Sequence, residues 1–254
     1  MIDYINEFQH FIKTLAEESA KVIRPYFRSE ISIEQKSDLS PVTIADKKAE
    51  ETLRNLIQRE FPQHGVIGEE FGEEKIDAEY VWVLDPIDGT KSFICGALSF
   101  GTLIALLHNN KPVLGVINHP ILNEFLIGDN YNTYLNDKSV SIRNTSSLDE
   151  AVLLATDHIH SEKYLGKEKF EKLINSVKIY RNWGDCYGYY LLSTGFADIM
   201  IDPIMLVWDK MALIPIIRGA GGIITDCKGN DAETGSSILA ASNLLHASVL
   251  KYFL

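Results

Sequence analysis

Asp85 and Asp88 are the first candidates for chemistry, because they follow an apolar run and lie three residues apart. Residues 81–84 suit a buried strand. Pro86 cannot donate to a strand ladder and Gly89 permits a sharp change of direction, so we expect the strand to give way to a turn at Asp85. Two carboxylates on one turn can converge on a hard cation such as Mg²⁺, which takes oxygen ligands from carboxylates, water and substrate phosphate.

The residues that follow offer a further ligand and a seat for phosphate. Pro86 leaves the Ile87 carbonyl free to act as an oxygen ligand, and Gly89-Thr90 predicts a helix start with outward N–H groups. A helix N-terminus favours phosphate because its first N–H groups lack partners and its dipole is positive there. A plainer interpretation is an Asp-Pro turn before an N-capped helix, and this segment alone does not decide between the two.

Other carboxylates are placed to complete such a site. Glu69 directly ends the buried-looking strand 66–68, and strand ends are where α/β layers place their chemistry. Thr43 is a good N-cap and Asp46 lies three residues later, as in a capping box. Asp46 is therefore either part of that cap or an outer metal contact. Asp209 stands at the start of a further predicted helix.

Size, charge and cysteine content restrict the class of protein. The 254 residues are 46% hydrophobic, enough for a large core in one domain or two tightly packed halves. The net charge of −11 argues against a nucleic-acid partner, and a phosphate substrate would need bound cations to invert the local field. Three cysteines far apart predict a reducing, cytoplasmic setting, and neither a signal peptide nor a membrane span is expected.

The apolar pattern divides the chain into halves of different organisation, 1–145 and 146–254. In the first half we expect helices at 3–27 and 44–60, a solvated loop at 73–79, and a meander of strands between 100 and 135. The second half alternates strands and helices, typical of α/β layers. The strands expected there are 151–155, 177–180, 197–201 and 223–226, and the helices are 163–175, 184–194 and 208–218.

Three acidic motifs together resemble those of the inositol-monophosphatase-like family of Mg²⁺-dependent, Li⁺-sensitive phosphatases. They are Gly68-Glu69-Glu70, the stretch Asp85 to Thr90, and Trp208-Asp209 followed by Gly219 to Gly222. Their order and approximate spacing match the family over nearly the whole chain. The resemblance implies a five-layered α/β/α/β/α sandwich, often assembled as a homodimer, that hydrolyses phosphate monoesters.

The resemblance also assigns roles to residues. It implies two or three Mg²⁺ ions, with Mn²⁺ as a substitute, and makes Asp46 the outer contact to a weakly held ion with Lys36 nearby. Thr90 and Glu69 would orient the attacking water. The N–H groups of Gly89 and Thr90 would hold the phosphate, and Asp209 would also contact substrate. The implied metal ligands are Glu69, Asp85, the Ile87 carbonyl, Asp88 and Asp209.

Within the family, the chain is most similar to histidinol-phosphate phosphatases. The similarity includes Gly184 to Tyr189, where Asp185 replaces a small neutral residue of typical inositol phosphatases. Asp185 and Asp202 are predicted to pair with the substrate amine, since a desolvated charge requires a partner; capping a helix is an equally good role for Asp185. Met211, and Asp202 where the family often has Glu, are departures that bear on substrate fit.

Three alternatives to a histidinol-phosphate phosphatase stay open at this point. The first is an inositol monophosphatase or a broad sugar-phosphate phosphatase. The second is a nucleotide-bisphosphate phosphatase, although neither an adenine pocket nor a basic cluster for a second phosphate is readable in the sequence. The third is a regulatory or binding protein that keeps the fold without turnover. Inactive relatives are expected to lose ligands, and every expected carboxylate is present here.

Overall fold

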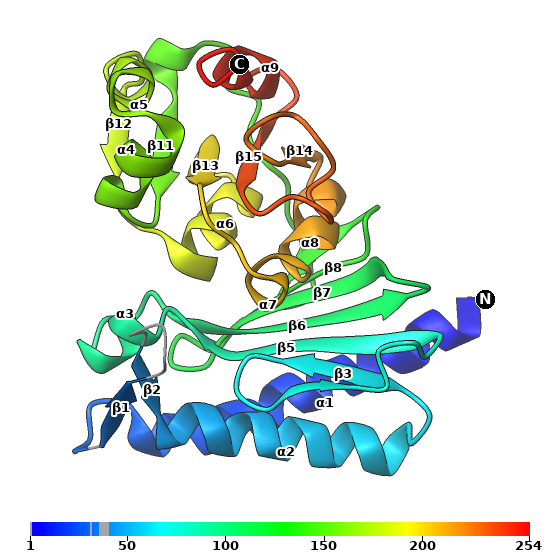
Figure 1. Cartoon of the computed structure of the whole chain (residues 1–254). Coiled ribbons are helices and arrows are strands. Elements are labelled where there is room, and N and C mark those ends of the chain that lie inside the picture. Colours follow the sequence, from blue (N-terminus) through cyan, green and yellow to red (C-terminus); the bar gives the residue numbers. More distant parts are fainter. Residues whose placement is uncertain (1, 31, 36–40) are drawn as a thin grey trace.

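The chain folds into five stacked layers of helices and sheets (Figure 1). The computed structural model describes residues 2–30, 32–35 and 41–254. Lys36 lies outside these described residues. The layers confirm the predicted α/β/α/β/α sandwich. In order they are helices α1 (Ile2–Ile23) and α2 (Ile44–Glu60), an eight-stranded sheet, helices α6 (Asp185–Ser193) and α8 (Leu213–Gly219), a five-stranded sheet, and helices α4 (His158–Leu165), α5 (Lys167–Ile174) and α9 (His246–Leu250).

The eight-stranded sheet has the order β10-β9-β8-β7-β6-β5-β3-β4. All its neighbours are antiparallel except β3 and β5, which run parallel. A separate hairpin pairs β1 (Ile33–Gln35) with β2 (Pro41–Thr43). The strands of the large sheet are β3 (Gly65–Gly68), β4 (Gly72–Glu74), β5 (Tyr80–Asp88), β6 (Gly101–His108), β7 (Lys111–His119), β8 (Glu124–Gly128), β9 (Thr133–Leu135) and β10 (Lys138–Ser139).

The five-stranded sheet has the order β12-β11-β13-β15-β14. Its strands β11, β12 and β13 are parallel, and β15 runs antiparallel to both β13 and β14. The proposed division at residue 145 remains a prediction; the large sheet uses residues 65–139 and the small one 152–242. The strands are β11 (Val152–Ala155), β12 (Ile179–Arg181), β13 (Ile199–Asp202), β14 (Gly222–Thr225) and β15 (Ile238–Ser242).

Apolar faces hold the layers together. Ile12 and Leu15 of α1 pack with Trp82 and Leu84 of β5 and with Leu53 of α2, all fully buried. A second core joins the large sheet, the middle helices and the small sheet. Among the described residues, no helix is sufficiently long and apolar to cross a membrane.

Two glycines bring α8 directly onto the large sheet. A Cβ on Gly115 of β7 would lie 1.9 Å from the Ala212 carbonyl oxygen, and one on Gly128 of β8 would lie 2.4 Å from the Ile216 Cα. Side chains at these positions would therefore keep the helix away from the strands. The glycines set the spacing between the layer that carries Asp85 and Asp88 and the segment that follows Asp209.

Several predicted elements have different bounds in the structure. The strand predicted to end near residue 84 continues to Asp88, with a register shift between Asp85 and Asp88. The predicted helix 163–175 is two helices, because Gly166 between them has φ +90°. The predicted helix 208–218 is likewise divided into α7 (Val207–Lys210) and α8. The first two residues of the loop expected at 73–79 belong to β4, and β15 and α9 were not predicted.

Short helical turns complete the fold. They are η1 (Arg24–Tyr26), α3 (Thr90–Ile94) and η2 (Leu148–Glu150).

Candidate active site

Three carboxylates from two distant parts of the chain converge. Asp85 and Asp88 lie at the end of β5 and Asp209 lies in α7, and one oxygen of each lies within 4.8 Å of the others. In a regular strand, residues three apart point to opposite faces. The register shift between Asp85 and Asp88 breaks that alternation and allows both side chains to reach one cluster.

Glu69 is held beside this cluster by the parallel pairing of β3 with β5. Gly68 pairs with Leu84, and the Glu69 N–H donates to the Leu84 carbonyl at 3.2 Å. The next residue on β5 is Asp85, and its carboxyl is close enough to Glu69 for the Glu69 charge to raise the pKa of Asp85. Parallel strands end at the same edge of a sheet, which explains why a prediction from strand ends found both residues.

Burial and mutual repulsion raise the pKa values of two of the clustered aspartates. Burial raises the pKa of Asp85 well above its usual range, and the charges of Glu69, Asp88 and Asp209 raise it further. Burial likewise raises the pKa of Asp88, with added repulsion from Asp185 and Asp209. The three converging carboxylates, with Glu69 beside Asp85, supply only oxygen atoms and fit a hard divalent cation, which would favour their ionised forms.

The turn between β5 and α3 is where the sequence predicts the phosphate seat. Gly89 has φ +84° and is the N-cap of α3, so the chain turns sharply there. The Thr90 hydroxyl donates to the Ile87 carbonyl at 3.0 Å, and the Ile87 N–H donates to Asp85 Oδ1 at 3.1 Å. Ile87 and Thr90 thus border the acid cluster.

Asp46 forms the capping box that the sequence offered as one of its two roles. Its Oδ2 accepts from the Thr43 N–H at 2.8 Å and from the Thr43 hydroxyl at 2.6 Å. Burial raises the pKa of Asp46, and the Glu69 charge adds to this. Asp46 therefore lies within electrostatic reach of Glu69 but is not one of the three converging carboxylates. A metal contact by Asp46 remains a prediction.

A cavity of about 340 Å³ opens beside the acids. Asp88, Asp185 and Asp209 line one side, and Leu206 and Trp208 contribute apolar surface. The lining also includes Lys91 and His160, so the cavity combines charged and apolar surface.

Asp185 and Asp202, the predicted substrate residues, both line the cavity but differ in their contacts. The Asp185 carboxylate lies against Gly89, where a Cβ would be 3.0 Å from its Oδ2. Burial raises the pKa of Asp185 to about 6 against the opposing effects of Lys91 and Ser92. Asp202 instead accepts from the Thr156 N–H at 3.1 Å and the Tyr189 hydroxyl at 2.9 Å. Burial raises the pKa of Asp202 to about 7.

Two contacts made by residues in the acid cluster or next to it in the chain were not found from the sequence. The Cys186 N–H, at the start of α6, donates to Asp88 Oδ2 and fixes that carboxylate from the second half of the chain. The sequence did predict a helix start at Gly184-Asp185, but it did not indicate that an N–H group of this helix start would contact Asp88. The second contact involves Lys210.

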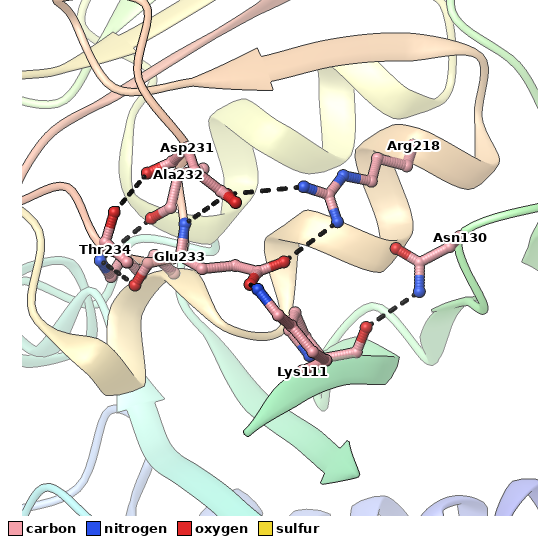
Figure 2. A network of polar contacts seen from close by, with 9 residues as sticks. Lys111, Asn130, Arg218, Asp231, Ala232, Glu233 and Thr234 are labelled. Carbon is pink, nitrogen blue, oxygen red and sulfur yellow. Dashed lines mark hydrogen bonds and ion pairs between the residues drawn. The ribbon is translucent and has the colours of Figure 1, made fainter. Parts of the chain in front are cut away.

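Lys210 is a buried cation directly after Asp209. Its Nζ donates to the carbonyls of Ala232 and Glu233, each at 3.0 Å, and to that of Gly235. Figure 2 shows the outer side of the same loop, where the Glu233 carboxylate meets Lys111 at 2.5 Å and Arg218 at 3.3 Å. The loop is thus anchored to α7 from inside and to β7 and α8 from outside.

Lys210→Met is expected to lower the free energy of unfolding by about 1 to 3 kcal/mol, because one buried and two half-buried carbonyls lose their donor. Urea denaturation followed by circular dichroism measures the change. Lys228→Met, at an exposed lysine in the same connection between β14 and β15, serves as the control. Equal midpoints for the two variants would show that the carbonyl contacts of Lys210 contribute no net stability.

Comparisons with known proteins agree with this fold and site. The model of the inositol monophosphatase family matches residues 5–253. The chain is 45% identical over 244 residues to the bifunctional phosphatase IMPL2, chloroplastic, of Arabidopsis thaliana, covering 94% of this chain and 70% of that protein. It is 34% identical over 239 residues to the histidinol-phosphatase of Chlorobaculum parvum, covering 93% and 92%.

A solved inositol monophosphatase from Zymomonas mobilis has the same fold, with a TM-score of 0.88, 38% identity and 98% of both chains covered. The chain therefore belongs to the inositol monophosphatase family, whose members are metal-dependent phosphatases that hydrolyse phosphate monoesters. The acid cluster is what such an enzyme requires. Relatives named for histidinol phosphate and for inositol phosphate both occur, so the family alone does not give the substrate.

Proposed function

We propose that this phosphatase is Mg²⁺-dependent and acts on L-histidinol phosphate, releasing L-histidinol and phosphate. The observation that carries the proposal is the cavity that places Asp185 next to the converging carboxylates Asp85, Asp88 and Asp209. Histidinol phosphate has an ammonium group on the carbon next to its phosphoester carbon. A carboxylate beside the phosphate seat is therefore positioned to meet that amine.

The proposed metal ligands are Glu69, Asp85, the Ile87 carbonyl, Asp88 and Asp209. Bound there, two or three Mg²⁺ ions, or Mn²⁺ in their place, would supply Lewis-acid stabilisation and lower the pKa of a coordinated water. The all-oxygen donor set and the repulsion among the buried acids support this assignment.

The remaining steps fall to the protein's own groups. Glu69 and the Thr90 hydroxyl, which lies 3.0 Å from the Ile87 carbonyl, would orient the attacking water in line with the leaving oxygen. The N–H groups of Gly89 and Thr90 would hold phosphate oxygens as negative charge develops. Asp209 would also contact the substrate, and Asp46 would be an outer contact for a weakly held ion.

Of the two predicted amine partners, Asp185 is better placed than Asp202. Each Asp202 oxygen accepts one hydrogen bond, from the Thr156 N–H or the Tyr189 hydroxyl, and these bonds restrict movement of the carboxylate toward a substrate amine. The Asp185 side chain lies directly against Gly89 of the proposed phosphate seat. Inositol phosphate, whose polyol part carries no amine or other cationic group, gains less from this carboxylate.

A turnover panel tests the substrate. Histidinol phosphate is expected to give the highest kcat/KM, ahead of inositol 1-phosphate and a 3′,5′-nucleotide bisphosphate, with all activity lost in EDTA. A higher kcat/KM for inositol 1-phosphate would favour the second candidate, an inositol monophosphatase, which the likeness to the Zymomonas mobilis structure supports. Absence of turnover on all three in Mg²⁺ would contradict both substrate assignments.

Asp185→Asn is expected to lower kcat/KM for histidinol phosphate by about 10- to 100-fold, the loss of one charge-assisted contact. The value for inositol 1-phosphate should change less than threefold, since that substrate has no amine. Asp149→Asn, at an exposed aspartate, is the control. Gly184 is the N-cap of α6, without a side-chain cap hydrogen bond, so the helix-cap role offered for Asp185 is not the one that the structure shows. An equal loss on both substrates would identify Asp185 as a structural residue and not a selector.

Three further properties belong to the proposal. We expect a homodimer, measurable by light scattering, and inhibition by Li⁺, measurable in the same turnover assay. A cytoplasmic location fits the three free cysteines. These expectations follow from the family resemblance and from cysteine usage, and none is needed for the chemistry at the acid cluster.

A further inference from the structure

Glu50 is a fully buried carboxylate whose contacts are with the turn that carries Glu69. Its Oε2 accepts from the Glu70 N–H at 2.7 Å, and its Oε1 accepts from the Phe71 N–H at 3.1 Å. Its side chain comes from α2, some 20 residues earlier in the chain. A buried charge is retained only where it is fully paired, and here two backbone amides supply part of that pairing.

Gly68 shows how closely the carboxylate is fitted to the turn. A Cβ at this position would lie 2.0 Å from Glu50 Oε1, so any other residue would displace the carboxylate. The glycine that ends β3 thereby makes room for Glu50.

Arg54 completes the contact on the same face of α2. Its Nε donates to Glu50 Oε1 at 2.7 Å, and its Nη2 donates to the Gly72 carbonyl. The guanidinium balances the buried charge and also holds the far end of the turn. One face of α2 therefore holds the turn 70–72 at both of its ends.

Glu69 is consequently held at both flanks. On one side its own N–H is bound to the Leu84 carbonyl of β5, one residue before Asp85. On the other side, the amides of Glu70 and Phe71 are bound to Glu50. With both neighbouring peptide groups fixed, the Glu69 side chain has only its own torsions left to vary, and its carboxyl meets that of Asp85.

We propose that Glu50 is a positioning residue, which pre-orients Glu69 for metal binding without touching the metal or the substrate. This inference rests on the proposed role of Glu69 as a metal ligand. Loss of the Glu50 contacts would let the turn move and would require a higher Mg²⁺ concentration to assemble the site. The chemistry of the assembled site would change little.

Glu50→Gln tests the inference, because an amide keeps the size of the side chain but presents an NH₂ group to one of two N–H donors. The Mg²⁺ concentration for half-maximal activity is expected to rise about tenfold, while kcat at saturating Mg²⁺ falls less than threefold. Glu51→Gln, at the neighbouring exposed position on α2, is the matched control. Mn²⁺ binding followed by electron paramagnetic resonance measures the metal affinity without any substrate.

The outcomes separate this inference from the proposed function. An unchanged Mg²⁺ requirement and Mn²⁺ affinity in Glu50→Gln overturns the positioning role. A wild-type protein that binds no Mn²⁺ and needs no Mg²⁺ overturns the metal-site assignment itself. If Glu50→Gln does not fold, Glu50→Asp retains the charge beside Arg54 on a side chain too short to reach the amides. The same rise in Mg²⁺ requirement then supports the inference, and its absence refutes it.

Discussion

Asp88→Asn is expected to lower kcat at saturating Mg²⁺ by at least about 10³-fold, the rate equivalent of about 4 kcal/mol of lost transition-state stabilisation. Asp88 shares one point with Asp85 and Asp209, so the substitution removes one of three converging charges. Asparagine keeps an oxygen that can accept from the Cys186 N–H, so the β5 end and the α6 start should stay in place. The expected loss is therefore one of metal binding and activity without loss of fold.

The same substitution, which lowers activity in Mg²⁺, should raise the thermal stability of the metal-free protein. Burial and the charges of Asp185 and Asp209 raise the pKa of Asp88, so folding opposes its ionisation. A raised carboxyl pKa means that the folded state binds more protons, and stability falls as pH rises above the ordinary aspartate value of about 4. In EDTA at pH 8, Asp88→Asn should unfold at a higher temperature than wild type.

Asp149→Asn, at an exposed aspartate, is the control for both measurements and should match wild type. The two readouts oppose each other, which distinguishes a metal ligand from a structural aspartate. Substitution of a purely structural aspartate would lower both the stability of the protein in EDTA and its activity. Turnover of Asp88→Asn close to the wild-type value at saturating Mg²⁺ would contradict the assignment of Asp88 to the metal site.

The sequence predicted correctly those elements whose ends are set by residues close to them in the chain. The helix predicted at 44–60 is α2, with the same bounds, and Thr43 with Asp46 forms its capping box. Both the cap and the apolar period of a helix lie within a few residues, so they can be read without knowing the fold. The same holds for the turn at Gly89 and the helix that begins at Thr90.

Elements that depend on tertiary contacts were less predictable. β5 continues past Pro86, although proline cannot donate to the ladder, because the strand is irregular there and the Pro86 carbonyl accepts from the Thr102 hydroxyl at 2.8 Å. The break at Gly166 divides a helix that apolar periodicity alone had joined. In both cases the sequence contained the relevant residue, but its partner or its backbone angle was set by the fold.

The acid cluster was predictable to a greater extent than the residues that support it. Carboxylates at strand ends and in turns are recognisable by position, and Asp85, Asp88 and Asp209 do converge. Glu50 and Arg54 have the i, i+4 spacing of an ordinary exposed ion pair on a helix, so nothing local indicates burial. Lys210 likewise has the character of a surface residue until the carbonyls of the loop 232–235 enclose it.

Gly115→Ala is expected to destabilise the protein by about 1 to 3 kcal/mol, the usual cost of overpacking a buried contact. The new Cβ would lie 1.9 Å from the Ala212 carbonyl oxygen, a backbone atom that cannot rotate away. Relief requires that the start of α8 move off the sheet. Asp209 lies only three residues before Ala212, so the same movement would draw its carboxylate away from Asp85 and Asp88. Weaker Mg²⁺ activation should therefore accompany the lower stability.

The control for Gly115→Ala is Gly221→Asn, at an exposed glycine with φ +85° and nothing within 4 Å of an added Cβ. Asparagine tolerates that backbone conformation, so this variant should keep both stability and Mg²⁺ activation. Urea denaturation and Mg²⁺ titration of activity on both variants measure the two effects separately. If Gly115→Ala loses stability while its Mg²⁺ activation stays at the wild-type level, the packing of α8 on β7 does not set the position of Asp209. The carboxylate would then be fixed within α7, where its Oδ2 accepts from the Leu206 N–H at 2.7 Å.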